Sequence, residues 1–459
     1  MKEPGRTPTP WKTIFSIGAI PAIVAVVELG RIHPDEVYQT LEPAYSRAFG
    51  YGALPWEWSA GIRNWAIPLA FSALLKLCAA IRISNPRVYR AVLEVPQYLL
   101  HVWMLGCVFQ YARRRLAAGP ALWATLAVGL YAPVIVFAGR TLGESFSTAF
   151  FIIAIEALDD PDPPTRGALL GGAALGFSVV ARYGSIALVL AALIWIALRR
   201  RWRVLLFSGL GGLAVAAALG VLDWVTWGKP FHSLVAYLDF NLFSGRAAQQ
   251  FGSAPGSYYV PVIARAAPLW AWIGIPFAAS KERPRIPLPL FCALIYIVAI
   301  SLVAHKEERF CYPALVLLAV AAAPGLMRAL ASLSNAVLRL PLAALAVASN
   351  AVGLALPGEL RAQRGDQFRA IVRSVRAPNA TGLLIVNEGL WGSGGFFYVG
   401  KNIPWATCDW PSDYNFQRAI RDPRFNRSVS YDRRAIPELE AAGFRVIDQI
   451  GLATILSRP

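Results

Sequence analysis

The stretch "RIHPDEVYQTLEPAYSRAFGYGALPWEWS" (residues 31–59) places two adjacent carboxylates, Asp35 and Glu36, directly after the apolar run Thr13–Gly30. Pro34 suits the first position of a helix, because its missing N–H is not needed there. The carboxylates then lie in the first turn, where the helix dipole favours negative charge. A carboxylate kept ionised in this position suits a general base for a hydroxyl group. Simple capping of the helix is the alternative interpretation.

The composition indicates a membrane protein. The chain of 459 residues is 56% hydrophobic and 15% charged, whereas a soluble domain usually has about a quarter of its residues charged. Apolar runs recur from Thr13 to about Leu356, which is typical of a polytopic helical protein. The first run lacks a small-residue cleavage site and leads into further spans, so we expect it to be a span and not a cleaved signal peptide.

The formal net charge of +17 does not indicate nucleic-acid binding, because the basic residues gather in short loops between apolar runs. The five cysteines are scattered without a CxxC pair and are predicted to be small buried hydrophobes. The four histidines form no HExxH-type pair, so no tightly bound metal or other cofactor is expected. Assistance by a divalent cation is left open.

Basic clusters orient the spans, because short cytoplasmic loops accumulate Lys and Arg. With the N-terminus inside, the cluster at 113–115 faces the cytoplasm only if the segment Arg63–Ile81 does not cross the membrane. That segment is therefore predicted to be a re-entrant or juxtamembrane helix, and about eleven spans alternate around it. The clusters used are Lys2/Arg6/Lys12, Arg113-Arg114-Arg115, Arg199-Arg200-Arg201 with Arg203, and Lys281/Arg283/Arg285. The predicted spans are 13–30, 90–111, 123–138, 145–158, 168–181, 185–198, 204–222, 261–279, 286–304, 312–327 and 340–356.

This topology groups the polar motifs on one side and divides the chain into two domains. Residues 1–356 are predicted to form a transmembrane catalytic domain, with a first outer loop at 31–89 and a large outer loop at 223–259. Residues 357–459 change composition and are predicted to form an extracytoplasmic soluble α/β domain, which we interpret as a capping or stabilising unit. The polar motifs predicted on the outer side are 33–58, 140–145, 182–185, 223–259 and 305–310.

Cationic side chains are the second chemical feature of the outer side. Isolated Arg and Lys residues at the ends of spans often only reach out to water. Several on one face suit a phosphate or pyrophosphate, which Arg holds with a fork of N–H donors. The residues concerned are Arg140, Arg182, His305, Lys306 and Arg309. Aromatic rings of the loop 222–261 can pack against sugars or form an ordinary interfacial belt.

Four motifs, in order, resemble those of the lipid-phosphate-mannose-dependent mannosyltransferases, a family that includes the GPI-anchor and N-glycan mannosyltransferases of the endoplasmic reticulum. They are "HPDEVYQTLEPAYSRAFGYGALPWEWS" (33–59), "RTLGES" (140–145), the loop 223–259 and "HKEERF" (305–310). The resemblance implies an all-α polytopic fold of the GT-C type, to which the small C-terminal α/β domain is added. It also implies an outward catalytic cleft, a polyprenyl-phosphate sugar donor, and transfer with inversion.

The resemblance also implies roles for particular residues. Asp35 would be the general base, with Glu36 as the second candidate. The donor phosphate is expected to contact the five cationic side chains Arg140, Arg182, His305, Lys306 and Arg309. The sugar and the acceptor are expected to contact His33, Gln39, Glu42, Trp56, Glu57, Trp58 and Tyr258. The motif "RTLGES" departs from its eukaryotic relatives, which usually have Ser-Asn in place of Gly143 and Glu144.

These observations predict a membrane glycosyltransferase that moves a hexose, mannose by resemblance, from a polyprenyl-phosphate donor to a glycan or lipid-linked acceptor on the extracytoplasmic face. Its partners would be that donor, a glycan or glycolipid acceptor and membrane lipids. A lipid-linked oligosaccharide ligase and a lipid-linked sugar transporter or flippase are the alternatives. The Ala- and Arg-rich composition indicates a GC-rich bacterium, so the predicted location is the inner membrane with the site facing the periplasm, or the lumen of the endoplasmic reticulum in a eukaryote.

Overall fold

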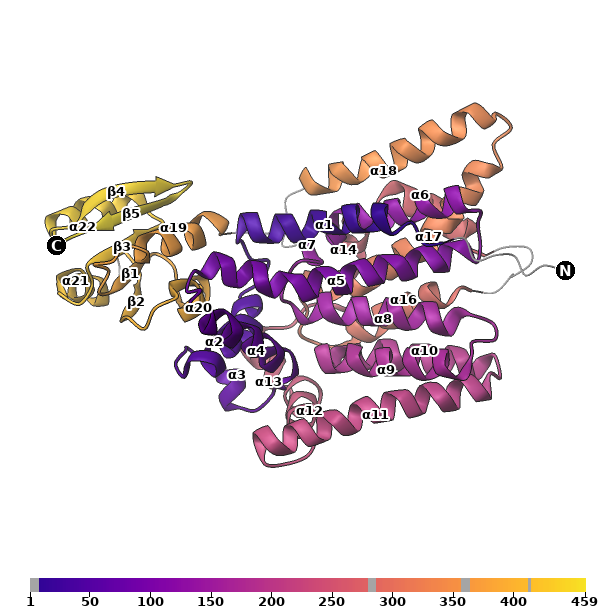
Figure 1. The fold of residues 1–459 in the computed structure, drawn as a ribbon, viewed down its shortest axis with the longest axis horizontal. Helices are drawn as coiled ribbons and strands as arrows, with labels where there is room; N and C mark the ends of the chain where they lie inside the picture. The colour runs from indigo at the N-terminus through magenta and orange to yellow at the C-terminus, as the bar shows by residue number, and fades with distance from the viewer. Residues whose placement is uncertain (1–7, 280–285, 356–363, 412–413) are drawn as a thin grey trace.

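The computed structural model describes residues 8–279, 286–355, 364–411 and 414–459. Its larger part is a bundle of helices, and a smaller α/β domain extends from one end of that bundle (Figure 1). Helix α1 (Trp11–Glu28) runs beside α5 (Pro86–Arg113) and ends near the α/β domain. Helix α17 (Tyr312–Ala331) lies in the core of the bundle, and almost every side chain along it is buried.

Within the described residues, four helical segments are long and apolar enough to cross a membrane, namely α1, α5, α11 (Trp202–Trp227) and Glu308–Ala331. The pair Gly256–Ala266 and Leu269–Phe277, which is bent by 102°, is a fifth candidate. Every span predicted from the sequence coincides with one helix or with successive short helices. The count of eleven spans stays a prediction. The helices at the other predicted spans are α6 (Ala118–Gly129), α7 (Ala132–Phe137), α8 (Gly143–Asp159), α9 (Thr165–Ala181), α10 (Ile186–Leu198), α16 (Leu288–Leu302) and α18 (Arg339–Ala355).

The segment predicted as one crossing at 261–279 is divided into α14 (Tyr259–Ala266) and α15 (Leu269–Gly274), followed by a short 3-10 turn. Proline lacks an N–H and disfavours the helical conformation of the residue before it. Ala267 accordingly has extended backbone angles (φ −71°, ψ 123°) directly before Pro268. The break between α14 and α15 therefore falls at Pro268, inside a continuous run of apolar residues.

The segment predicted not to cross the membrane forms α4 (Ala66–Ala80). Phe71 and Leu75 are buried on it and belong to the same apolar cluster as Tyr45 of α2 (Glu42–Phe49). The predicted helix after Pro34 also forms. It begins as the π-helical turn η1 (Glu36–Leu41), which continues directly into α2.

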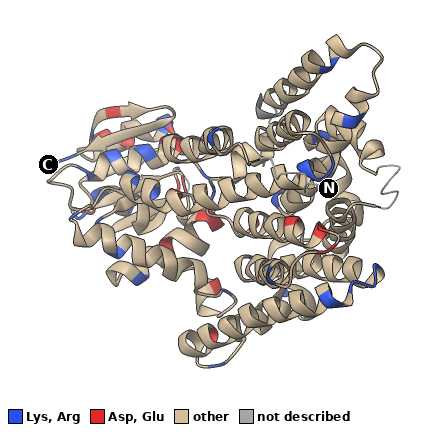
Figure 2. Ribbon diagram, turned by 45° about the vertical axis from the view of Figure 1, so that its right-hand side comes forward, with Lys and Arg blue, Asp and Glu red and all other residues tan. Residues whose placement is uncertain are grey.

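The basic clusters at 113–115 and 199–203 lie at the end of the bundle away from the α/β domain (Figure 2). There they surround the acidic turn after α8. Arg115 Nη2 lies 2.7 Å from Asp159 Oδ2, and Arg203 Nη2 lies 2.9 Å from Asp162 Oδ1. Their common position agrees with the predicted grouping of these loops on one side. Two further parts of the predicted clusters, Lys2/Arg6 and Lys281/Arg283/Arg285, lie outside the described residues.

The C-terminal domain has the predicted α/β character. Its five-stranded sheet has the order β2-β1-β3-β5-β4. Strand β1 pairs in parallel with β2 and with β3, and β5 pairs in an antiparallel manner with β3 and with β4. The predicted boundary at 356–357 lies outside the described residues. The strands are β1 (Leu383–Val386), β2 (Trp405–Cys408), β3 (Arg427–Ser430), β4 (Arg445–Ile450) and β5 (Ala453–Ser457). The helices are α19 (Gly365–Val375), α20 (Gly395–Val399), α21 (Tyr414–Arg421) and α22 (Ile436–Ala441).

The C-terminal domain is docked on the first outer loop through Glu42. This side chain is fully buried. Its carboxylate accepts N–H groups from Ala53 at 2.7 Å, from Phe397 at 2.8 Å and from Phe396 at 3.1 Å. The hydroxyl group of Tyr38 lies 2.7 Å from the hydroxyl group of Ser393. The same loop that carries Asp35 is thus held in place by the C-terminal domain.

Candidate active site

A cavity of about 460 Å³ lies at the end of the bundle that carries the outer loops. Five segments far apart in the sequence line it, within 33–63, 143–144, 181–190, 237–251 and 299–310. Each polar motif predicted on the outer side contributes at least one lining residue. Among the described residues of the C-terminal domain, none lines the cavity.

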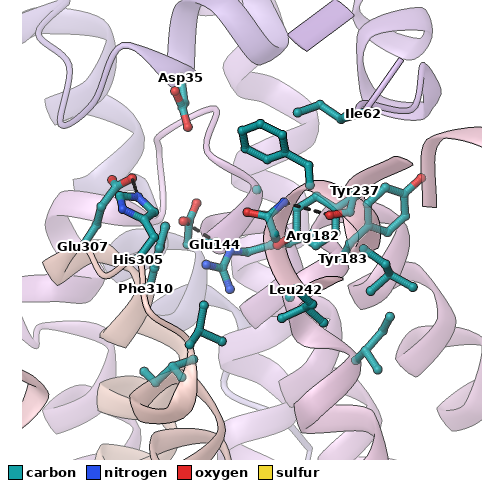
Figure 3. Close-up of a pocket in the computed structure, with 18 of the residues that line it drawn as sticks. Asp35, Ile62, Glu144, Arg182, Tyr183, Tyr237, Leu242, His305, Glu307 and Phe310 are labelled. Atoms are coloured by element: carbon teal, nitrogen blue, oxygen red, sulfur yellow. Dashed lines mark hydrogen bonds and ion pairs between the residues drawn. The ribbon is translucent and has the colours of Figure 1, made fainter. Parts of the chain in front are cut away.

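Asp35 projects into the cavity from the first outer loop (Figure 3). Its Oδ2 atom accepts a hydrogen bond from Arg309 Nη2 at 2.7 Å, and its Oδ1 atom lies 3.1 Å from His33 Nδ1. Burial by itself would raise the pKa of Asp35, but the charges of Arg309 and His33 outweigh this effect and hold the pKa well below its usual value. The Asp35 carboxylate is therefore ionised at neutral pH.

Arg309 is shared by three carboxylates. Besides Asp35, its Nε atom donates to Glu307 Oε2 at 2.5 Å, and its Nη1 atom lies 3.6 Å from Glu144 Oε1. Glu307 also lies 3.0 Å from His305 Nε2. Burial would raise the pKa of Glu307, but Arg309 and His305 together lower it to about 2. On this side of the cavity one guanidinium group thus faces three carboxylates.

Arg182 lies between the charged part and the apolar part of the cavity. Its Nε atom is 3.2 Å from Glu144 Oε1, and its Nη1 atom donates to the hydroxyl group of Tyr296 at 2.7 Å. Its guanidinium group also lies 4.8 Å from the ring centre of Phe310. In Figure 3 Arg182 separates Asp35 from Leu242.

The apolar part of the cavity is formed by α10 and α16. Ile186 and Leu190 line it from α10, and Ala299 and Ile300 line it from α16. The cavity therefore has one end rich in ionised groups and one end that suits a hydrocarbon chain.

Trp56 and Glu57 form another wall of the cavity. Glu57 Oε1 accepts hydrogen bonds from Arg63 Nη2 at 2.6 Å and from Gln39 Nε2 at 2.9 Å. The ring of Trp56 packs against that of Phe240, with 5.0 Å between the ring centres. This pair joins the first outer loop to the large outer loop.

The structure places eight of the fourteen sequence-predicted site residues at the cavity. These are His33, Asp35, Gln39, Trp56, Glu57, Arg182, His305 and Arg309. The other six do not line it, and each contacts other parts of the protein. These are Glu36, Glu42, Trp58, Arg140, Tyr258 and Lys306.

Glu36 and Arg140 form a buried network behind the cavity. Arg140 is 1% exposed; it donates to the carbonyl of Gly30, and its Nη2 atom lies 3.2 Å from Glu28 Oε2. Glu36 accepts the N–H of Ile32 at 2.5 Å and lies 4.0 Å from Arg140. The neighbouring carboxylates Asp35 and Glu36 thus face different surroundings, and the structure does not bring Glu36 or Arg140 to a phosphate in the cavity.

The remaining predicted residues make their contacts outside the cavity. Lys306 Nζ donates to the carbonyl of Ala254 at 2.9 Å, and Trp58 Nε1 donates to the carbonyl of Tyr38 at 3.0 Å. The ring of Tyr258 packs edge-on against its neighbour Tyr259. Glu42 serves the docking of the C-terminal domain.

Sequence reasoning missed several residues at the cavity, chiefly Arg63, Glu144, Glu307 and Asn241. Glu307 stands inside the quoted motif "HKEERF", of which the cations alone are predicted to contact the phosphate. Arg63 begins the segment that is predicted to be re-entrant or juxtamembrane. Acids inside a cationic motif are a usable signal, because buried cations need partners. Among the described residues, no group of three or more His, Cys, Asp or Glu side chains is arranged to hold a metal ion.

Comparisons with known proteins agree on one family. The sequence profile of the "Alg9-like mannosyltransferase family" matches residues 10–358. GPI mannosyltransferase 3 of Yarrowia lipolytica is 30% identical over 311 residues, which cover 63% of this chain and 57% of that protein. The Candida albicans protein of the same name is 27% identical over 287 residues, with 61% and 56% covered. The chain thus matches less than two thirds of the length of these relatives.

A solved structure shares the whole fold. The crystal structure of ArnT from Cupriavidus metallidurans bound to undecaprenyl phosphate superimposes with a TM-score of 0.62 over 98% of both chains, at 13% sequence identity. The likeness therefore includes the C-terminal α/β domain, which lies beyond the residues that the family profile matches.

Proposed function

Because the chain belongs to the Alg9-like mannosyltransferase family, we propose that it is a membrane glycosyltransferase that moves mannose from a polyprenyl-phosphate donor to a glycan or glycolipid acceptor, with inversion. The family assignment confirms the resemblance drawn from its motifs. One observation carries the proposal: a single cavity joins an ionised carboxylate, Asp35, to an apolar end between α10 and α16.

A polyprenyl-phosphate fits this two-ended cavity. Its hydrocarbon chain would lie against the side chains from α10 and α16, such as Leu190 and Ile300. Its phosphate would then meet Arg182, whose forked donors suit phosphate oxygens. The ArnT structure of the same fold contains undecaprenyl phosphate, which supports this class of donor.

Asp35 is the proposed general base. The acceptor hydroxyl group attacks the anomeric carbon of the sugar from the face opposite the phosphate, and its proton passes to the Asp35 carboxylate. The carbon–oxygen bond to the phosphate breaks, and its electron pair leaves on the phosphate oxygen. Arg182, with His305 and Arg309, would stabilise the charge that develops there.

Arg309 couples donor binding to the strength of the base. In the resting protein it lowers the pKa of Asp35, which makes that carboxylate a weak base. A donor phosphate would compete for Arg309 and would add negative charge near Asp35. Both effects raise the pKa of Asp35, so the base would gain strength when the donor is bound.

We further propose that the cavity faces the extracytoplasmic side of the membrane. The basic turns at 113–115 and 199–203 lie at the other end of the bundle (Figure 2), and such turns favour the cytoplasm. This side is the periplasm in a bacterium and the lumen of the endoplasmic reticulum in a eukaryote.

The test is transfer of labelled mannose from polyprenyl-phosphate mannose to a panel of glycans by the purified protein. Asp35→Asn should lower kcat by about a thousandfold while the protein remains folded. Glu36→Gln, the matched control in the adjacent position, should keep wild-type activity. Full activity of Asp35→Asn would remove the assigned base.

The same assay separates the two alternative functions. An oligosaccharide ligase would transfer a whole glycan from a polyprenyl-diphosphate donor, which is offered in parallel. A transporter or flippase would move a lipid-linked sugar without forming a new glycosidic bond.

A further inference from the structure

A second hollow lies beside the cavity, on the other side of Trp56. It has a volume of about 500 Å³, within the range of small-molecule sites. The first outer loop contributes Trp56 and Ile62, and the large outer loop contributes Phe240, to both hollows. Its outer rim contains exposed residues of α13 (Arg246–Phe251). We refer to this hollow as the outer groove.

The outer groove combines aromatic rings with hydrogen-bonding groups. Trp56 packs against Phe240, and the guanidinium group of Arg246 lies 5.5 Å from the ring centre of Phe240. Arg246 forms an ion pair with Asp239. The side-chain amides of Gln249 and Gln250 are exposed and form no hydrogen bond with any other residue that the structure describes.

These groups suit a neutral sugar. A pyranose ring offers an apolar C–H face to an aromatic side chain and hydroxyl groups at its edge, which both donate and accept. Two amides, a carboxylate and a guanidinium group supply both kinds of partner. The charges of Asp239 and Arg246 cancel, so the outer groove has no excess of either sign that would select a phosphate or another ionised group.

The position of the outer groove assigns it to the acceptor and not to the donor. None of its lining residues belongs to α10 or α16, which form the apolar end of the cavity. It borders instead on Trp56, next to the segment that carries Asp35. An acceptor must present its hydroxyl group to this carboxylate.

We propose that the outer groove is the subsite that binds the sugar unit next to the one that receives the mannose. Gln249 and Gln250 are then specificity-determining residues for that second unit. This inference rests on the proposed transferase function.

The test compares two acceptors that differ by one sugar, an octyl hexoside and the corresponding octyl disaccharide. The wild-type protein should show a KM about tenfold lower for the disaccharide, as expected for a few net hydrogen bonds. The double variant Gln249→Ala/Gln250→Ala should raise this KM toward that of the monosaccharide. Its kcat and its KM for the donor should stay unchanged.

Two further variants make the test specific. Ala60→Trp fills the outer groove from an exposed position and should remove the preference for the disaccharide in the same way. Gln417→Ala changes an exposed glutamine of the C-terminal domain and should preserve the preference. An equal KM for both acceptors in the wild-type protein, or a preference that survives both groove variants, would overturn the inference.

Binding of the octyl disaccharide without donor, measured by saturation-transfer NMR, distinguishes failure of the inference from failure of the proposed function. Binding that is lost in the groove variants supports the sugar site even if the wild-type protein transfers no mannose, and only the transferase function then fails. If the wild-type protein transfers mannose, but neither disaccharide binding nor the preference for the disaccharide changes in the groove variants, only the acceptor site is overturned. If the wild-type protein neither transfers mannose nor binds the disaccharide, both the transferase function and the acceptor site are overturned.

Discussion

Asp35 and Glu36 are joined by one peptide bond, yet their carboxylates meet different partners. Asp35 lies between Arg309 and His33 on the cavity wall, whereas Glu36 accepts a backbone N–H in the interior. Cations beside a carboxylate stabilise its ionised form and lower its pKa. The chemical role at this site therefore depends on the partner of each side chain.

Arg309→Gln should introduce an acid limb into the pH profile of kcat/KM. In the wild-type protein the pKa of Asp35 lies well below its usual value, so Asp35 stays ionised and the rate should not fall between pH 8 and pH 5 on its account. Without the Arg309 charge, burial raises this pKa, and residual activity should decline as the pH falls. Arg309→Lys keeps the charge and should keep the flat profile. A flat profile in both variants would contradict the assignment.

Arg182 and Arg140 should respond differently to the same substitution. Arg182→Gln removes a cation of the proposed donor site and should raise the KM for the donor about 10- to 100-fold, with little change in melting temperature because Glu144 keeps Arg309 as a partner. Arg140→Gln leaves buried groups unpaired and should reduce the free energy of unfolding by about 3 kcal/mol. Enzyme kinetics and thermal unfolding in detergent measure the two effects. Equal effects of both variants on the KM would contradict the separation.

At the scale of elements, α9 and α11 pack closely because glycines on each helix face the backbone of the other. A Cβ atom added to Gly211 would lie 2.1 Å from the carbonyl oxygen of Leu169, and one added to Gly172 would lie 1.9 Å from that of Ser208. Small residues allow the backbones of membrane helices to approach in this way. This helix pair supports Arg182, which directly follows α9.

Gly211→Ala should therefore destabilise the protein by about 1–3 kcal/mol, because the added methyl group forces α9 and α11 apart. The melting temperature should fall, and activity should fall with it as Arg182 shifts. Gly209→Ala is the matched control on the same helix, since nothing lies within 4 Å of its added Cβ. A similar loss of stability in the control would show that helix packing is not the cause.

The positions of helices were largely predictable, but their breaks were not. Apolar runs identified α1, α5 and α11, because hydropathy is summed over many residues and tolerates single exceptions. The bend between α14 and α15 falls at Pro268. A proline can end, bend or merely begin a helix, and neighbouring helices decide which of these occurs.

At the scale of the whole molecule, the C-terminal domain is coupled to the first outer loop through Glu42. Burial raises the pKa of Glu42 to about 7, although three backbone N–H groups oppose this effect. In the unfolded chain the pKa of this carboxyl group is about 4.3. The folded protein therefore holds a proton that the unfolded chain releases, and stability should decrease as the pH rises from about 4.3 through 7.

The pH dependence of docking should disappear in Glu42→Gln, which stays neutral. Between pH 5 and pH 8 the wild-type protein should lose up to about 3 kcal/mol of stability that this variant keeps. The measurement is the difference in melting temperature between the two proteins across that range. Asp448→Asn, which changes a partly exposed carboxylate of β4, should keep the wild-type slope. An unchanged slope in Glu42→Gln would contradict the role of Glu42.

The amino-acid sequence by itself determined the class of protein, its family and the set of loops that carry polar motifs, because hydropathy, basic clusters and motif order are properties of the chain. Only the tertiary structure decided which polar side chains share the cavity. Asp35 meets Arg309 across 274 positions of the chain, and no local spacing encodes such a contact. Arg140 and Arg182 both follow apolar runs in the sequence. Packing buries Arg140 behind the cavity, whereas Arg182 lines it. The physical reason is that side-chain direction at the end of a helix is set by its neighbours in space.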